Sequence, residues 1–297
     1  MTTIYFELLV CSHEAWENEM PFRRVLSAMR HGVPRVLPPL AVLVSAAVIA
    51  IAATAASGES ADTFAKGAEA YKAYVVEQVA GTLAGVKDLQ SAIKAGDAKA
   101  AQAAWIKSRV GWERVEPITA EFFGEFDEVI DPWPDAKQGY HAIEARLFAG
   151  NLAELSAPTD KLVADVAAFD KAVRAPSFRF SAQGLLDGAT KLAYELGEKK
   201  AQGGESPYAG TSLIDMRDNL QGIDTLYKTV LQAPLKAKDA KLAQSIAEKI
   251  KDVETTLKAQ DIKSLDQAKL QKTAEELAAL LQETAPHLGL KKPSLSD

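Results

Sequence analysis

The chain has 297 residues and a formal net charge of −6 at pH 7; 47% of the residues are hydrophobic and only 7% are aromatic. This length is enough for one large domain or for two smaller ones, each with its own core. Abundant alanine, leucine, lysine and glutamate favour an all-α fold, and the acidic balance argues against nucleic-acid binding.

Residues 1–56 have the order of a secretory signal peptide. Four arginines precede an apolar run over residues 40–56, which ends in small residues with an Ala-x-Ala pattern. We therefore predict cleavage near residues 55–57 and a periplasmic mature protein. A membrane anchor is the alternative, although the run is short for a bilayer span. Residues 1–19 are unusual ahead of such a leader and are interpreted as a non-native extension.

The only cysteine, Cys11, lies upstream of the predicted cleavage point. The mature chain is therefore expected to have no disulfide and no lipid-anchored cysteine.

Helical periodicity predicts helices over residues 62–95, 97–117, 118–123, 139–149, 158–174, 181–201, 211–233, 239–259 and 264–285, with no convincing strand. Gly96 and Asp97 are typical residues for ending one helix and capping the next. Between Phe123 and the helix at 139, Pro132 and Pro134 predict a loop.

The fold class predicted from this pattern is all-α, with two packed up-and-down helical bundles at residues 57–170 and 171–297. Residues 93–107 and 235–249 share eight identities in fifteen positions. An internal duplication explains this similarity, and so does the alanine-rich composition of both segments, so the two interpretations stay open.

The segment GYHAIEARLF, at residues 139–148, holds one of the two histidines of the predicted mature chain. Positions three apart lie on one face of a helix with Cβ atoms about 5–6 Å apart, so His141 and Glu144 can contact one cation. A surface hydrogen bond has the same spacing. The pair alone therefore does not decide between the two.

Several carboxylates that precede this segment strengthen the metal interpretation. Glu113 and Glu116 share a helical face, and Asp127 and Asp131 follow in the predicted loop. Any one of them could equally lie on a solvated face or form an ordinary ion pair, such as that of Arg109 with Glu113. Together with an imidazole they form a hard-leaning donor set, which suits iron, zinc, manganese or calcium.

Three segments, in the same order, resemble the imelysin-like family, and in particular its periplasmic iron-uptake components EfeO and EfeM. They are RVGWERVEPITAEFFGEFDEVID, GYHAIEARLF and GEKKAQGGESPYAGTSLIDMRDNLQG. The resemblance covers most of residues 60–285 and extends to alginate-binding members of the group. It implies two packed helical bundles with a cleft between them and a metal site at the H-x-x-E helix. The ligands that it implies are His141, Glu144, Asp127, and Glu113 or Glu116.

Two features depart from this family pattern. EfeO proteins usually begin with a cupredoxin-like domain, whereas here only a few residues separate the predicted leader from the first helix, as in the short EfeM-like form. The segment between Asp131 and Gly139 is also shorter than in the iron-uptake members, which leaves the position of Asp127 relative to His141 open.

The function predicted from these observations is that of a periplasmic binding protein. It would capture a metal ion, with iron, zinc and calcium as candidates, and deliver it to an inner-membrane permease. The second predicted ligand is alginate or another polyuronate, which an acidic protein would hold through a bridging cation or local basic groups. Candidate basic residues are Arg146, Arg179, Lys199, Lys200 and Arg217.

The alternative function is that of an imelysin-like metallopeptidase. Zinc peptidase helices normally offer two histidines, whereas HAIEA has one, and the other mature histidine, His287, stands in the C-terminal tail. No enzyme is therefore expected. Because a metal needs a neutral imidazole, binding at His141 is expected to weaken as pH falls through about 6.5.

Overall fold

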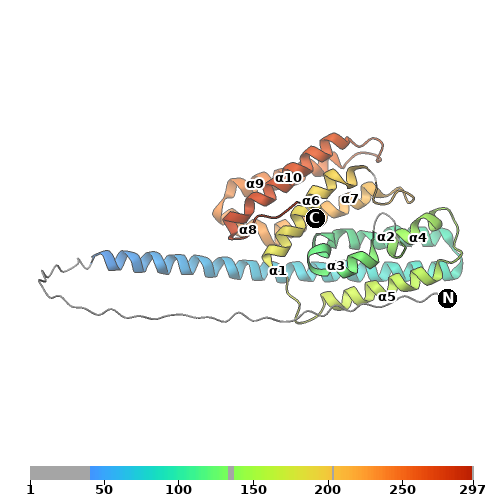
Figure 1. The fold of residues 1–297 in the computed structure, drawn as a ribbon, viewed down its shortest axis with the longest axis horizontal. Coiled ribbons are helices and arrows are strands. Elements are labelled where there is room, and N and C mark those ends of the chain that lie inside the picture. Colours follow the sequence, from blue (N-terminus) through green and yellow to red (C-terminus); the bar gives the residue numbers. More distant parts are fainter. Residues whose placement is uncertain (1–40, 133–136, 203, 296–297) are drawn as a thin grey trace, which may run out of the picture. The chain divides into compact units, whose positions relative to one another are not determined.

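The computed structural model describes residues 41–132, 137–202 and 204–295. In these ranges the chain forms helices and no strand, which confirms the all-α prediction (Figure 1). The elements in order are α1 (Ala41–Ala95), α2 (Ala98–Val115), the 3-10 helix η1 (Glu116–Ile118), α3 (Thr119–Ile130), α4 (Gly139–Phe148), α5 (Ser156–Val173), α6 (Ala182–Glu198), the 3-10 helix η2 (Lys200–Gln202), α7 (Ser212–Leu226), the π-helical turn η3 (Tyr227–Leu231), α8 (Gln232–Lys238), α9 (Ala240–Thr256) and α10 (Gln267–Leu288).

The chain divides into a unit of residues 1–49 and a compact unit of residues 50–297, and the second contains the whole candidate site. The predicted signal peptide lies largely outside the described residues, so its cleavage stays a prediction. Within the described residues, none of the helices combines enough length with enough apolar character to cross a bilayer. The predicted bundle boundary after residue 170 and the predicted duplication also stay predictions.

Capping residues fix several helix ends close to their predicted positions. Gly96 ends α1 with a φ of 75°, and the Asp97 carboxylate accepts a hydrogen bond of 2.9 Å from the backbone N–H of Ala100 in the first turn of α2. Asp239 makes the same contact with the N–H of Leu242 at the start of α9. The two segments with similar sequences therefore share one local structure.

The predicted loop over residues 124–138 is wrong in its first half. Helix α3 continues to Ile130, with a kink at Phe123 where φ is −146° and ψ is 35°. A proline restricts mainly the residue just before it, so Pro132 makes only Asp131 non-helical and the helix ends at Ile130 rather than earlier. Asp127 therefore lies on a helix and not in a loop.

The predicted boundaries at residues 62 and 234 also differ from the structure. Helix α1 begins at Ala41, since the alanine-rich sequence ahead of residue 62 is itself a good helix former. The chain passes from α7 through η3 into α8, which contains Pro234. The wider π-helical turn relieves the clash that a proline ring makes with the carbonyl four residues earlier.

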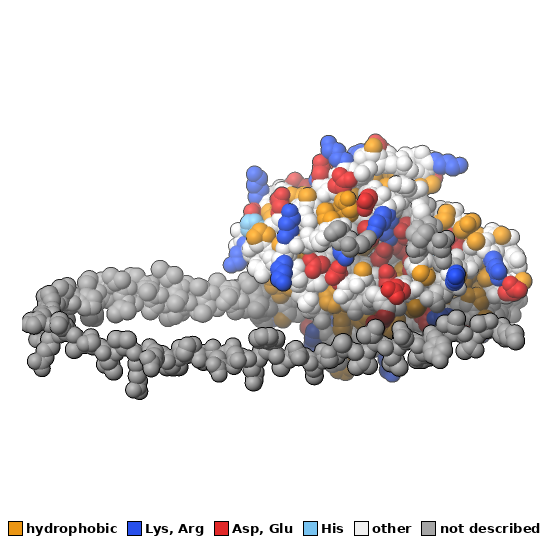
Figure 2. All heavy atoms as spheres, in the orientation of Figure 1, with side chains coloured by type: hydrophobic (Ala, Val, Ile, Leu, Met, Phe, Trp, Pro, Cys, Tyr) orange, Lys and Arg blue, Asp and Glu red, His pale blue; other side chains and the backbone are white. Residues whose placement is uncertain are grey.

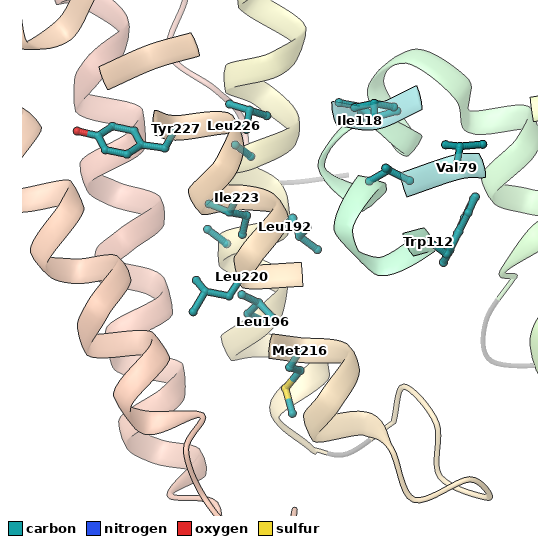
Figure 3. Packing of buried hydrophobic residues seen from close by; sticks show 14 of the residues in the cluster. Val79, Trp112, Ile118, Leu192, Leu196, Met216, Leu220, Ile223, Leu226 and Tyr227 are labelled. Carbon is teal, nitrogen blue, oxygen red and sulfur yellow. The ribbon is translucent and has the colours of Figure 1, made fainter. Parts of the chain in front are cut away.

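Apolar side chains hold the helices of the second unit together. Helix α6 packs along α10, α10 packs on α9, and α2 packs against α7. Figure 3 shows Leu192 and Leu196 of α6 beside Leu220 and Ile223 of α7, all of them buried. Each such leucine stabilises the fold by about 1.5–3 kcal/mol relative to an exposed one.

Close backbone contacts place η1 against α6 and α7. A Cβ atom at Gly188 would lie 1.9 Å from the carbonyl oxygen of Pro117 in η1. One at Gly222 would lie 2.4 Å from the carbonyl oxygen of Arg114, at the end of α2, and 3.2 Å from Cδ of Pro117. Only glycine permits these approaches. They bring Glu116, the first residue of η1, next to the helices that form the other side of the site.

Candidate functional site

The motif helix α4 begins at a backbone position that requires glycine. Gly139 has a φ of 72°, and a Cβ atom there would lie 2.2 Å from the carbonyl oxygen of Ile130. The next residue, Tyr140, is buried with its ring edge-on to Trp105 at 5.9 Å between centroids. These contacts fix the direction in which His141 leaves the helix.

His141 has a carboxylate at each ring nitrogen. Its Nδ1 lies 3.1 Å from Oε2 of Glu144, as the i,i+3 spacing predicts, and its Nε2 lies 3.1 Å from Oδ1 of Asp131. Burial alone would lower the pKa of His141, but the charge of Asp131 and the hydrogen bonds to both carboxylates raise it to about 9. The imidazole is therefore protonated at neutral pH.

Asp131 joins the histidine to two further side chains. Its carboxylate accepts hydrogen bonds of 2.8 Å from Arg109 and 2.8 Å from the indole N–H of Trp112. Burial alone would raise the pKa of Asp131, but the positive charges of Arg109 and His141 hold it well below its ordinary value. This aspartate stays ionised across the physiological range.

Arg109 is a fully buried positive charge behind His141 and Asp131. It pairs with Glu113 one helical turn later, and its Nε lies 3.4 Å from Oδ2 of Asp215. Its guanidinium also lies over the rings of Trp105 and Tyr140, at 5.2 Å and 5.3 Å from their centroids. The predicted Arg109–Glu113 pair is thus present, in the interior rather than on the surface.

Glu113 is fully buried and faces the interior. Besides Arg109, it accepts a hydrogen bond of 2.8 Å from the side-chain amide of Asn219, which also bonds to Glu116. Burial raises the pKa of Glu113 well above its ordinary value, although Arg109 opposes this. Of the two glutamates considered as alternatives, only Glu116 lines the open pocket described next.

A pocket of about 490 Å³ lies in front of His141. In Figure 2, acidic side chains (red) gather with a few basic ones (blue) on the face turned to the viewer. Six carboxylates, two lysines and one histidine line the pocket together with Pro132 and Gly204; these charged and titratable residues are Glu116, Asp127, Glu128, Asp131, His141, Glu195, Lys199, Lys200 and Glu205.

Several of these groups resist ionisation because they are buried close to one another. Burial raises the pKa of Glu116 to about 7, with the Lys200 charge opposing, and burial raises the pKa of Asp127 to about 6. Asp127 and His141 line the same pocket, so the short segment before α4 does not separate them.

Glu144 links α4 to the segment that precedes α7. The side chain of Glu144 is 0% exposed, and its Oε1 accepts hydrogen bonds of 2.9 Å from the backbone N–H groups of Tyr208 and Ala209. The same segment carries Glu205 into the pocket and leaves the Tyr208 residue 64% exposed.

The five basic residues predicted for polyuronate binding do not converge. Lys199 and Lys200 line the pocket. Arg146 pairs with Glu154 on the surface, Arg179 pairs with Glu69, and Arg217 lines a different pocket between α7 and α9.

In the described part of the chain, no three histidine, cysteine or acidic side chains are arranged as a ready metal site. The predicted donors instead contact internal partners: Glu113 contacts Arg109, Glu116 contacts Lys200, and Glu144 contacts His141. The donor chemistry still fits a cation, because one imidazole and several carboxylates lie in or beside one pocket.

Sequence reasoning missed the parts of the site that come from distant segments. Glu195 and Glu205 line the pocket. From α7, Asp215 contacts Arg109, and Asn219 donates hydrogen bonds to Glu113 and Glu116. Glu205 lies within GGESPYAG, a segment that carried the family resemblance, and this was the one available signal for it.

The Imelysin family model, which is labelled as a peptidase family, matches residues 67–138 and 128–287 of the chain. EfeO of Escherichia coli O1:K1 / APEC is 31% identical over 198 residues, which cover 63% of this chain and 52% of EfeO. EfeM of Pseudomonas syringae pv. syringae (strain B728a) is 30% identical over 190 residues, which cover 60% of this chain and 66% of EfeM. Both relatives are named iron uptake system components, and the chain spans about half the length of the EfeO that it matches.

A solved structure has a similar fold. It is that of an iron-regulated protein A precursor from Parabacteroides distasonis ATCC 8503, with a TM-score of 0.64 and 13% sequence identity. The match covers 76% of this chain and 95% of the other. At this identity the likeness concerns the helical fold alone.

Proposed function

The chain belongs to the imelysin family, and we propose that it captures iron ions in the carboxylate pocket beside His141 as a component of an iron uptake system. The observation that carries this proposal is the placement of His141 between Glu144 and Asp131 at the edge of a pocket lined by six carboxylates. The names of the EfeO and EfeM relatives support iron as the cargo.

The donor set favours a hard or borderline cation. Carboxylate oxygens suit ferric iron, and an imidazole nitrogen adds a donor that ferrous iron and zinc also accept. Calcium takes oxygen ligands alone and would gain nothing from His141. Among the three candidate metals, the site therefore favours iron and zinc over calcium.

A metal that binds His141 must replace a proton. With a pKa of about 9, the imidazole carries a proton on each nitrogen at neutral pH, held by Asp131 and Glu144. Metal uptake should therefore release protons over a range that reaches to about pH 9, and not only near 6.5 as expected for an unperturbed histidine.

We further propose that the mature protein works in the periplasm and hands its cargo to an inner-membrane permease. The support is the leader-like order of residues 1–56 and the names of the relatives. N-terminal sequencing of protein from a periplasmic fraction should find a start between residues 53 and 61. A start at Met1 or Met20 would contradict export by cleavage.

The other two functions have less support from the structure. The second histidine that a zinc peptidase would need does not line the pocket, because His287 lies at the end of α10 with its Nε2 3.9 Å from Asp239. A polyuronate site would need converging basic groups, whereas three of the five candidates lie away from the pocket and Lys200 is engaged with Glu116.

The proposal is tested by titrating the purified protein with ferrous iron under argon, with ferric citrate and with zinc, using calorimetry and metal analysis. His141→Ala and Glu144→Ala should each weaken iron binding at least tenfold. Each substitution removes one donor and also the contact that orients the other side chain. His287→Ala is the matched control and should bind as the wild type does. If all four proteins bind iron equally, or if none binds it, the site is wrong.

A further inference from the structure

Lys200 is a buried cation inside the acidic pocket. It is the first residue of η2 and follows Lys199, the C-cap of α6, and its side chain is 6% exposed. Its Nζ lies 2.7 Å from Oε1 of Glu116 and 3.1 Å from Oε1 of Glu205. A lysine is rarely buried to this extent unless its charge is compensated.

The two carboxylates reach this ammonium group from separate parts of the fold. Glu116 comes from η1, which is packed between α6 and α7, and Glu205 comes from the segment after η2. Without a cation between them their negative charges would repel each other. Lys200 therefore occupies the place among these oxygens that a bound cation would take.

We propose that Lys200 is a built-in competitor of the cargo cation. Its ammonium group holds Glu116 and Glu205 in the cation-free protein and leaves them when the cargo takes their oxygens. Lys200 thereby lowers the affinity of the pocket for cations, because every cation must displace the ammonium group before it can bind Glu116 and Glu205. This inference rests on the proposed cation-binding function and names the residue that tunes it.

The neighbouring lysine provides a matched control. Lys199 lines the same pocket, but its side chain is 54% exposed and its Nζ lies 3.2 Å from Glu195 on the same helix. Removing Lys199 changes the charge of the pocket by the same amount as removing Lys200. Only the removal of Lys200 releases Glu116 and Glu205 from their ion pairs.

The test compares Lys200→Met, Lys199→Met and Lys200→Arg with the wild type, using ferrous iron under argon and zinc as probes in calorimetry. Lys200→Met should bind both ions at least tenfold more tightly, which corresponds to about 1.4 kcal/mol. Lys199→Met should stay within threefold of the wild type, since it alters only the general field. Lys200→Arg keeps the charge and should show no tightening.

Equal or weaker binding by folded Lys200→Met would overturn the inference and make Lys200 a fixed part of the site. If circular dichroism shows that Lys200→Met does not fold, Lys200→Gln is tested in its place. Failure of both to fold would also overturn it, because Lys200 would then be a structural ion pair. Equal tightening by the two lysine variants would show a general charge effect instead. If the wild type binds neither ion and His141→Ala makes no difference, the proposed function itself fails.

Discussion

His141 has an unusual environment, because a carboxylate contacts each side of its ring. The Asp131 contact of 3.1 Å is the larger influence on its charge, and Asp131 is in turn held by Arg109 and Trp112. The affinity of the imidazole for protons therefore depends on a residue outside the H-x-x-E motif. The proposed metal binding at His141 would therefore depend on Asp131 as well as on Glu144.

Asp131→Asn should lower the pKa of His141 from about 9 toward its ordinary value of 6.5, because the neutral amide no longer stabilises the imidazolium. An NMR titration of the imidazole ring measures this directly. Asp127→Asn is the control: it removes a carboxylate from the same pocket and should leave the pKa of His141 near 9. Equal shifts in the two variants would mean that the field of the whole pocket, and not the Asp131 contact, sets this value.

The sequence was sufficient to predict the contact of His141 with Glu144, because helix geometry makes positions three apart neighbours. It was not sufficient to predict the partners of Glu113 and Glu116. Asn219 lies more than a hundred residues later in the chain than either glutamate, and no local pattern indicates that α7 packs there.

Helix α4 depends on a single backbone conformation at its first residue. Gly139 combines a φ of 72° with a close approach to the carbonyl oxygen of Ile130, so this residue ties the start of the motif helix to the end of α3. The distance between Asp131 and His141 follows from this junction. Helix α3 itself was predicted too short, since the prolines of the following segment were taken to act over more residues than they do.

Gly139→Ala should destabilise the protein by about 2–4 kcal/mol and weaken cation binding, because it adds a steric clash to an unfavourable φ. Gly150→Ala measures the cost of the unfavourable φ alone. Gly150 has a φ of 74°, but an added Cβ would meet nothing within 4 Å. That variant should lose only about 1 kcal/mol. Urea unfolding measures both values. Equal losses would show that the contact with Ile130 has no energetic weight.

The whole compact unit contains several acidic groups whose ionisation the fold opposes. Burial raises the pKa of Glu116 to about 7, that of Asp127 to about 6 and that of Asp215 to about 6, and the pKa of His141 lies near 9. A group whose pKa is raised by folding contributes stability below its unfolded pKa and loses that contribution as pH rises through the folded value. The affected window therefore runs from about pH 4 to about pH 9.

The cation-free protein should accordingly unfold at a lower temperature at pH 9 than at pH 5. A loss of about 2 kcal/mol corresponds to about 4–8 °C for a chain of this size. In the double variant Glu116→Gln, Asp127→Asn, the melting temperature should fall less between pH 5 and pH 9. Iron at a hundred times its Kd should restore about 2.7 kcal/mol at neutral pH, because it binds only the folded state. Differential scanning calorimetry at several pH values checks all three, and a melting temperature that rises with pH would contradict them.

The division of the Glu144 carboxylate between two partners has a kinetic consequence. Its Oε2 contacts His141, and its Oε1 accepts hydrogen bonds from the backbone N–H groups of Tyr208 and Ala209. A cation that recruits this carboxylate would compete with those amides, and the segment with the exposed Tyr208 ring would be released for as long as the cation is bound. Re-forming two hydrogen bonds takes nanoseconds to microseconds, so the segment would follow each exchange without delay. Faster deuterium uptake at the Tyr208 and Ala209 amides would then report, from the surface, what fraction of the molecules holds an ion.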